Sequence, residues 1–337
     1  MKRSIAVLLP VLVLFALEAR SQVPGPLKLI QDIRLPGLHD GDFDHFVVDL
    51  PGQRLFLAAE DNSALETIDL RSNNVIHTTN GLTQPHSMAY NAELKKLFVA
   101  DETELKIYDA TAYKLLGTIP MKAHADASIY DPATKLYYVG NGGKRDKEDY
   151  ILISVVDTTS NRKVADIRLN VGRVEGMAIE KSGSRLFVNL TDNDAVAVID
   201  REKRTVTTTW SVAQEGRGNA PMAFNEPDHR LFVVTRDPGR VVVLDSDTGK
   251  IVTSEPYAGM ADDAVYDAKS GRLYVAGVPF ISVFQKRTAD RYDLLGQVPT
   301  AFHAMTAILV PEVNRYYLAV NHHGDTDAEV QVYSVVP

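Results

Sequence analysis

Carboxylate and imidazole side chains recur along this chain at a fixed distance from a repeated basic residue, and side chains of these types can bind cations or polar ligands. Counting ten residues back from each basic residue, or nine in the third repeat, gives seven equivalent positions: Asp44, His86, Asp126, Glu175, Ala220, Asp262 and Met305. Five of the seven are ionisable. His45 and Asp263 directly follow two of them. His124 and His303 lie two residues before two others.

A divalent cation is one ligand that such residues can bind when they converge. Oxygen-rich sets suit Ca²⁺, Mg²⁺ or Mn²⁺, and mixed nitrogen and oxygen sets suit Zn²⁺ or Fe²⁺. The sequence therefore predicts a site for a cation such as Ca²⁺ or Mn²⁺, with candidate ligands Asp44, His86, Asp126, Glu175 and Asp262. The same region could instead bind an organic or protein ligand, or only cap strands and hold channel water. The residues alone leave these alternatives open.

Several other kinds of chemistry have no basis in the sequence. The chain has no cysteine, which excludes covalently attached haem c, thiolate metal sites and disulfides. It contains no G-x-S-x-G, H-E-x-x-H, G-x-x-x-x-G-K-[ST] or G-x-G-x-x-G motif. Ser87 follows His86, but adjacency does not make a catalytic triad. We therefore assign no catalytic residue and no nucleotide cofactor.

The elements that must position the candidate residues belong to a repeat. A basic residue followed by a short apolar run occurs seven times, beginning at Arg54, Lys96, Lys135, Arg185, Arg230, Arg272 and Arg315. The steps between them are 42, 39, 50, 45, 42 and 43 residues. A period of about 40 to 50 residues, rich in aromatic and β-branched side chains, is typical of a propeller. The longest step contains a charged insertion at residues 141–149, which we expect at the rim of the site.

Each repeat is predicted to form four short strands. In the fourth repeat they cover residues 174–179, 185–190, 195–199 and 205–210. The first hairpin contains Gly183, which is able to take a positive φ. In five of the seven repeats the third strand ends in Asp, whose side chain can accept backbone N–H bonds in the next turn.

Closure of the ring is predicted from a missing strand. The seventh repeat stops at Pro337, right after its third strand, while residues 28–35 form a spare strand at the other end. The sequence thus predicts an all-β, seven-bladed propeller of four-stranded antiparallel blades, closed by the N-terminal strand, in a single domain at residues 22–337. The innermost strands all start at one face of the ring, which we call the mouth face. A polar funnel is expected there.

The repeat resembles that of the YVTN-repeat, YncE-like family of seven-bladed propellers. The segments that carry the resemblance include Tyr137-Tyr-Val-Gly-Asn141, Arg185-Leu-Phe-Val-Asn189 and Lys96-Leu-Phe-Val-Ala100. It covers residues 27–337. The resemblance implies the fold and, for most members, export. It implies no particular activity, because related propellers include both binding proteins and enzymes.

The N-terminus has the features of a secretory signal peptide. Lys2 and Arg3 precede an apolar run at residues 5–17, and small residues allow cleavage after Ser21. The run is too short to span a bilayer, and no other apolar stretch is long enough. We therefore interpret residues 1–21 as a signal peptide and expect a periplasmic or secreted protein.

The net charge of the chain indicates which kinds of partner it can bind. The full chain has a formal net charge of −8, and residues 1–21 carry three basic and one acidic side chain, so the mature chain would carry −10. That charge disfavours nucleic acid, although DNA binding has been associated with the YncE-like family. Few aromatic residues lie in the predicted loops to stack bases.

The favoured interpretation is that the chain is an exported, monomeric, non-catalytic protein. It would bind a small molecule or a protein in the funnel on the mouth face. The funnel would be lined by His, Asp and Glu side chains. The alternative is a divalent-metal-dependent hydrolase or lyase acting on lactone or sugar substrates. In that case the cation would polarise a carbonyl and a histidine would act as general base.

Overall fold

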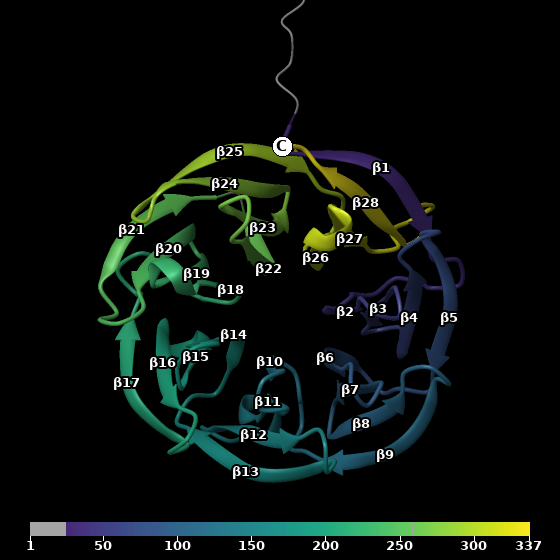
Figure 1. Ribbon diagram of the computed structural model, residues 1–337, viewed down its shortest axis with the longest axis horizontal. Coiled ribbons are helices and arrows are strands. Elements are labelled where there is room, and N and C mark those ends of the chain that lie inside the picture. Colours follow the sequence, from purple (N-terminus) through teal and green to yellow (C-terminus); the bar gives the residue numbers. More distant parts are fainter. Residues whose placement is uncertain (1–24, 258) are drawn as a thin grey trace, which may run out of the picture.

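A computed structural model describes residues 25–257 and 259–337 as a ring of seven four-stranded antiparallel sheets (Figure 1). The seven-bladed propeller predicted from the repeat is confirmed. The proposed signal peptide, residues 1–21, lies outside the described residues. In the part of the chain that is described, helix is limited to four short 3₁₀ segments, and none of them could cross a membrane.

The first four blades follow the chain from the inner to the outer strand. Blade 1 contains β2 (Phe46–Asp49), β3 (Arg54–Ala59), β4 (Ala64–Asp69) and β5 (Asn74–Asn80). Blade 2 contains β6 (Pro85–Asn91), β7 (Lys96–Asp101), β8 (Glu104–Asp109) and β9 (Lys114–Pro120). Blade 3 contains β10 (Ser128–Asp131), β11 (Leu136–Gly142), β12 (Ile151–Asp157) and β13 (Arg162–Leu169), with the 3₁₀ segment η1 (Gly143–Asp146). Blade 4 contains β14 (Val174–Ile179), β15 (Arg185–Leu190), η2 (Thr191–Asn193), β16 (Ala195–Asp200) and β17 (Thr205–Ser211).

The last three blades complete the circle. Blade 5 contains β18 (Met222–Asn225), η3 (Glu226–Asp228), β19 (Arg230–Arg236), β20 (Gly239–Asp245) and β21 (Ile251–Pro256). Blade 6 contains β22 (Met260–Asp267), β23 (Arg272–Val278), β24 (Phe280–Thr288) and β25 (Arg291–Pro299). Blade 7 contains β26 (Ala307–Val310), η4 (Pro311–Val313), β27 (Arg315–Val320) and β28 (Glu329–Val335), with β1 (Leu27–Arg34) as its outer strand.

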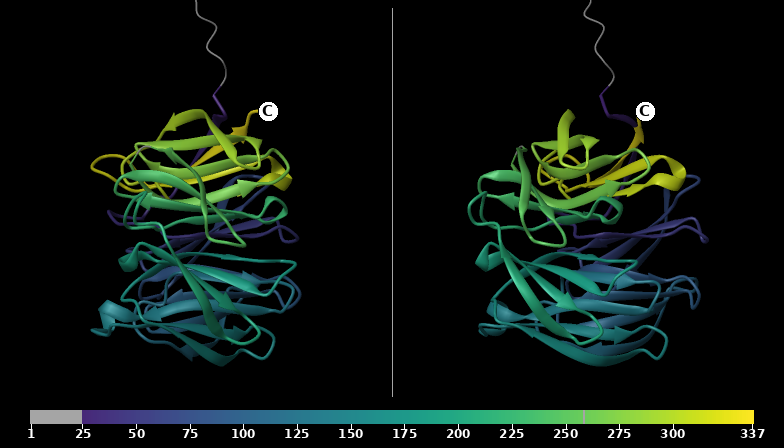
Figure 2. Two further views of the ribbon diagram at one scale, coloured as in Figure 1. Left: turned by 90° about the vertical axis from the view of Figure 1, so that its left-hand side faces the viewer. Right: turned by 60° about the vertical axis from the view of Figure 1, so that its left-hand side comes forward.

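Closure occurs as the sequence predicted. β1 pairs antiparallel with β28, from Leu27 opposite Val335 to Arg34 opposite Glu329. The side views show the two chain segments together at the outer edge of the ring (Figure 2). Pairing the first strand with the last leaves no blade incomplete, so the ring has no open blade edge inside it.

The core lies between neighbouring blades. In β15, Leu186 and Val188 pack with blade 3, while Phe187 between them packs with blade 5. Successive strand residues point to opposite faces. A sheet covered on both faces therefore needs the continuous apolar run that marks each repeat. The outer strand β17 is mostly exposed, which explains why its sequence is rich in threonine.

In several repeats the basic residue that marks the repeat ties adjacent blades together. Arg54 donates to Asp49 at 3.0 Å within blade 1 and to the carbonyl oxygen of Ala110 in blade 2. Arg185 likewise donates to Glu180 at 2.8 Å and to the carbonyl oxygen of Ser246 in blade 5. The repeat's most visible residue is thus structural, and it plays no part in the mouth of the channel.

The turns after the third strands follow the prediction, and Gly183 in the first hairpin of blade 4 has a steric role. The terminal Asp of the third strand accepts backbone N–H bonds as expected, for example Asp109 from Thr111 and Ala112 at 2.8 Å each. Gly183, however, does not take a positive φ. A Cβ there would come within 2.2 Å of the Glu180 carboxylate, so the position needs glycine for space rather than for backbone conformation.

Candidate functional site

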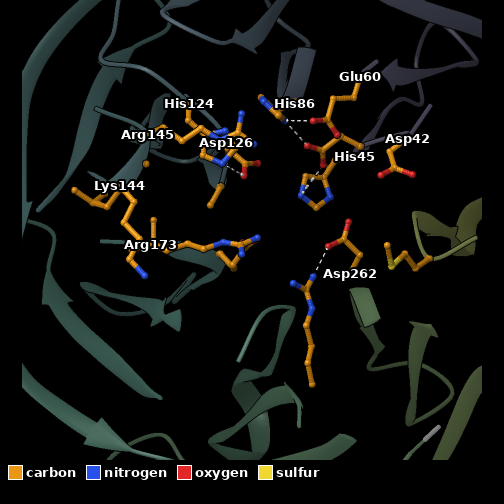
Figure 3. Close-up of a pocket in the computed structure, with 18 of the residues that line it drawn as sticks. Asp42, His45, Glu60, His86, His124, Asp126, Lys144, Arg145, Arg173 and Asp262 are labelled. Carbon is orange, nitrogen blue, oxygen red and sulfur yellow. Dashed lines mark hydrogen bonds and ion pairs between the residues drawn. The ribbon is translucent and has the colours of Figure 1, made fainter. Parts of the chain in front are cut away.

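The innermost strands surround the channel, and a cavity of about 420 Å³ lies at its mouth (Figure 3). A second cavity of about 190 Å³ is lined by residues further along the same strands, such as Phe46, Met88 and Met177. His45, Glu175 and Asp262 line both cavities. These polar side chains therefore form the boundary between the mouth and the rest of the channel.

Eight of the nine sequence-predicted site residues line the mouth cavity: Asp44, His45, His86, His124, Asp126, Glu175, Asp262 and His303. Asp263 lines the second cavity instead. Its carboxylate lies 3.0 Å from His45 Nδ1 and accepts the Ala307 backbone N–H at 2.8 Å. Asp263 thus holds His45 in place from behind rather than facing the mouth.

Local irregularities in the inner strands position several of these side chains. The register shifts between Pro85 and Met88 in β6, between Val174 and Met177 in β14, and between Ala261 and Asp263 in β22. These shifts contain His86, Glu175 and Asp262. A bulge inserts an extra residue and redirects side chains, so regular strand alternation alone would not place these three groups.

Asp44 and His86 form the most buried polar pair at the mouth. Asp44 is 7% exposed and His86 is 1% exposed. His86 Nδ1 lies 2.7 Å from Asp44 Oδ2 and 3.7 Å from Glu60 Oε1, and His45 Nε2 lies 3.3 Å from the other Asp44 oxygen. Burial opposes the charge on His86, but the carboxylates of Asp44, Asp126 and Glu60 outweigh it and raise the pKa of His86 to about 9.

His124 has the opposite electrostatic environment. Burial, followed by the positive charges of His86, Arg145 and Arg173, lowers the pKa of His124 to about 3. Its Nε2 lies 3.3 Å from Asp126 Oδ2, which at neutral pH is therefore a contact with a neutral imidazole. Burial raises the pKa of Asp126 as well. Two histidines near one another thus differ in charge.

The five predicted metal ligands do not come together as one set. Asp44 groups with His45 and Asp126, and separately with Glu60 and His86, with ligand atoms within 4.8 Å of one another in each group. Glu175 and Asp262 instead form ion pairs with arginines. Asp262 lies 2.9 Å from Arg236, and Glu175 is in close contact with Arg173.

Basic side chains at the mouth were largely missed by the sequence analysis. Lys144 and Arg145 come from the insertion, which was expected at the rim, but Arg173 and Arg236 were not anticipated. Arg173 precedes β14 by one residue and lies two residues before Glu175, a spacing that could have indicated a pair. Arg236 ends β19 in blade 5 and reaches Asp262 in blade 6, and nothing in the sequence links them.

Two other histidines on the mouth face lie outside the cavity lining. His322 Nδ1 is 2.5 Å from Asp40, and the ring of His323 stacks on Phe302 with centroids 4.0 Å apart.

Comparison with known proteins supports the fold alone. The sequence matches no protein-family model and no curated relative. The structure is similar to a chain of the mitotic checkpoint complex (14% identity, TM-score 0.75, covering 100% of this chain and 99% of that one). It is also similar to the WD40 repeats of RRP9 (12%, 0.76, 94% and 99%) and to Kuenenia stuttgartiensis hydrazine synthase (19%, 0.72, 88% and 98%). The YVTN-repeat family stays a prediction.

Proposed function

We propose that this chain is an exported, non-catalytic binding protein whose mouth cavity takes a small organic molecule carrying both an anionic group and a cationic or donor-rich group. The observation that supports this is the division of charge across the cavity. Lys144, Arg145 and Arg173 lie on one side, and Asp42 and Glu60 lie on the other (Figure 3). A molecule with separated charges fits such a site with each end opposite its counter-charge.

Size and scaffold agree with this proposal. A cavity of about 420 Å³ is within the usual range for small-molecule sites. Propeller scaffolds are typical of interaction domains, and one structural neighbour is a chain of a multiprotein complex. The mouth is open to solvent, so a ligand can enter without a movement of the blades.

The non-catalytic part of the proposal rests on Ser87, the hydroxyl residue that follows His86 at the mouth. Ser87 donates to the backbone carbonyl oxygen of Asp126 and lies 3.4 Å from the Tyr137 hydroxyl. A serine nucleophile needs a histidine that accepts its proton. The hydroxyl of Ser87 is instead engaged with a peptide carbonyl.

Ligand binding is best tested with a panel of small molecules and one matched pair of variants. Amino acids and amino-sugar acids are expected to raise the melting temperature, whereas neutral sugars are not. Arg173→Gln should weaken the binding of a hit by about tenfold or more, because the anionic end loses a charged hydrogen-bond donor. Isothermal titration calorimetry measures the change.

The control for Arg173 is Arg168→Gln. Arg168 lies on the outer strand β13 against Tyr150, away from the cavity. It should leave ligand affinity unchanged. The proposal is wrong if no charged molecule shifts the melting temperature, or if both variants weaken binding equally.

Export is part of the same proposal and makes its own prediction. Protein recovered from the periplasm or the medium is expected to begin at Gln22, because cleavage after Ser21 fits the pattern of small residues. Mass spectrometry of the intact protein measures this directly. Recovery of the chain in the cytoplasm with residues 1–21 attached would contradict it.

The second candidate function is the metal-dependent hydrolase or lyase. What favours it is the mixture of imidazole and carboxylate groups around Asp44, since such groups can hold a cation that polarises a substrate carbonyl. Turnover of lactones or sugar acids that depends on an added divalent cation would favour this function over simple binding.

A further inference from the structure

Two imidazole nitrogens at the mouth are buried and have no hydrogen-bond partner. They are His86 Nε2 and His124 Nδ1. The two rings meet edge to face, with centroids 5.0 Å apart. In Figure 3 the two side chains lie next to each other on one wall of the cavity. A buried nitrogen without a partner costs free energy, which a ligand for that nitrogen would recover.

The other nitrogen of each ring is held by a carboxylate. His86 Nδ1 lies 2.7 Å from Asp44, and His124 Nε2 lies 3.3 Å from Asp126. Histidines that bind metals almost always have this arrangement, because a carboxylate behind the ring fixes its orientation and makes the free nitrogen a better ligand. Both rings therefore direct a nitrogen to the place of an ion, and metal binding must release the proton that His86 Nε2 carries at neutral pH.

A third ligand lies beside them. The ligand atoms of His86, His124 and Glu102 are all within 4.8 Å of one another. An ion about 2.1 Å from each ligand needs them about 3.0 to 3.5 Å apart, so ligand atoms at the 4.8 Å limit would have to approach by about 1.3 to 1.8 Å. Glu102 lies in the turn between β7 and β8 and His124 lies in the loop before β10, so neither residue is part of a strand.

We propose that His86, His124 and Glu102 bind one divalent ion of the zinc class at the wall of the mouth cavity. Two imidazoles and one carboxylate suit Zn²⁺, Co²⁺ or Fe²⁺ rather than Ca²⁺, which prefers oxygen ligands. Three protein ligands leave at least one coordination position open. Since His86 and His124 both line the cavity, that position faces the space in which a small ligand would sit.

This set differs from the one expected from the sequence. It shares His86 with the earlier candidates but replaces the carboxylates by His124 and Glu102. Asp44 is less available than it looks from the sequence, because one of its oxygens faces His86 and the other faces His45. It supports the site from behind.

Arg145 competes with the ion. Its guanidinium lies 3.6 Å from Glu102 and is half exposed, on the short segment η1. In the ion-free protein this cation neutralises Glu102. When the ion binds, the arginine can move into solvent at little cost. Removing its charge should therefore strengthen metal binding, which a purely structural cluster would not predict.

The test is titration of the purified, chelator-treated full chain, without a histidine tag, with Co²⁺. One equivalent is expected to bind and to give the visible absorption of a Co²⁺ ion with nitrogen ligands, and Zn²⁺ should displace it. His124→Gln and Glu102→Gln should each weaken binding by about 100-fold or more, because removing a ligand should cost at least as much as the 10- to 100-fold of a supporting group. Arg145→Gln should strengthen it by about threefold or more.

Two controls make the outcome decisive. His322→Gln changes another mouth-face histidine that is paired with Asp40 and should leave affinity unchanged. Arg168→Gln, on the outer strand β13 and outside the cavity lining, should also leave Co²⁺ binding unchanged. Because the titration contains no organic ligand, the ion site can fail or succeed independently of the proposed organic ligand. Melting temperatures identify any variant that does not fold. The inference is overturned if no stoichiometric ion binds, or if the glutamine variants at positions 102 and 124 both fold and bind Co²⁺ as tightly as the original chain.

Discussion

A chain that starts at Pro36 is expected not to fold cooperatively. It lacks β1, which forms seven residue pairs with β28 and buries Leu27 and Ile33, and it also lacks the buried Leu35 that follows. Burying three such side chains contributes about 5 to 9 kcal/mol. The whole stability of a domain is about 5 to 15 kcal/mol. The truncated protein should therefore show no urea transition and should aggregate, and a soluble, cooperatively unfolding product would contradict the account of closure.

A circular permutant separates strand pairing from the mere loss of residues. The backbone N–H of Val336 donates to the carbonyl oxygen of Pro26 at 3.0 Å, so the two ends can be joined by a short linker. New termini between Thr111 and Ala112 fall in the turn between β8 and β9. β9 would then close blade 2 as β1 closes blade 7. This permutant should fold, with a stability within about 2 kcal/mol of the original chain.

The fold could be predicted because its signals are local and repeated. Each second strand is buried on both faces, so it must be apolar throughout, and seven copies at nearly even spacing leave few architectures. The prediction that residues 28–35 complete the last blade followed from counting strands, since the seventh repeat had only three of its four strands. The steric role of Gly183 could not be predicted in the same way. Steric contact with Glu180 leaves no trace in a sequence, whereas a glycine in a turn usually indicates a positive φ.

The sequence predicted where the candidate site lies, but not which side chains interact within it. Equivalent offsets in the repeat, together with the histidines next to them in the sequence, placed eight of the nine candidates around one cavity. The partners of each side chain depend on contacts between blades, as with Arg236 and Asp262. Which nitrogen of His86 is free depends on where Asp44 lies, and the bulge in β6 settles that. Such details need coordinates, because they are set by geometry across the ring rather than along the chain.

Asp262→Asn is expected to stabilise the protein at pH 8 and to change its stability little near pH 4. Burial, and then the carboxylates of Asp44, Asp263 and Glu175, raise the pKa of Asp262 to about 7, although His45 opposes them. Arg236, 2.9 Å away, does not reverse the shift. In the unfolded chain an Asp has a pKa of about 3.9.

The sign follows from proton binding. Between about pH 4 and pH 7 the folded protein holds a proton on Asp262 that the unfolded chain has lost, so the original chain loses stability as the pH rises through this window. The loss is complete above about pH 7. Three pKa units correspond to at most about 4 kcal/mol, and losing the ion pair with Arg236 reduces the gain in the variant. Urea unfolding at several pH values measures the difference.

Asp149→Asn is the matched control, since the Asp149 carboxylate is 98% exposed. The difference in unfolding free energy between this variant and the original chain should not vary with pH in the same way. A difference for Asp262→Asn that is flat, or that grows as the pH falls, would contradict the assignment. If Asp262→Asn stabilises the fold as expected, the Asp262 carboxylate does not stabilise the fold as a strand cap would. Residues that lower stability are typical of binding sites, where the charge is kept for what it binds. The same measurement therefore distinguishes a ring of structural caps from a ring of ligand-binding groups.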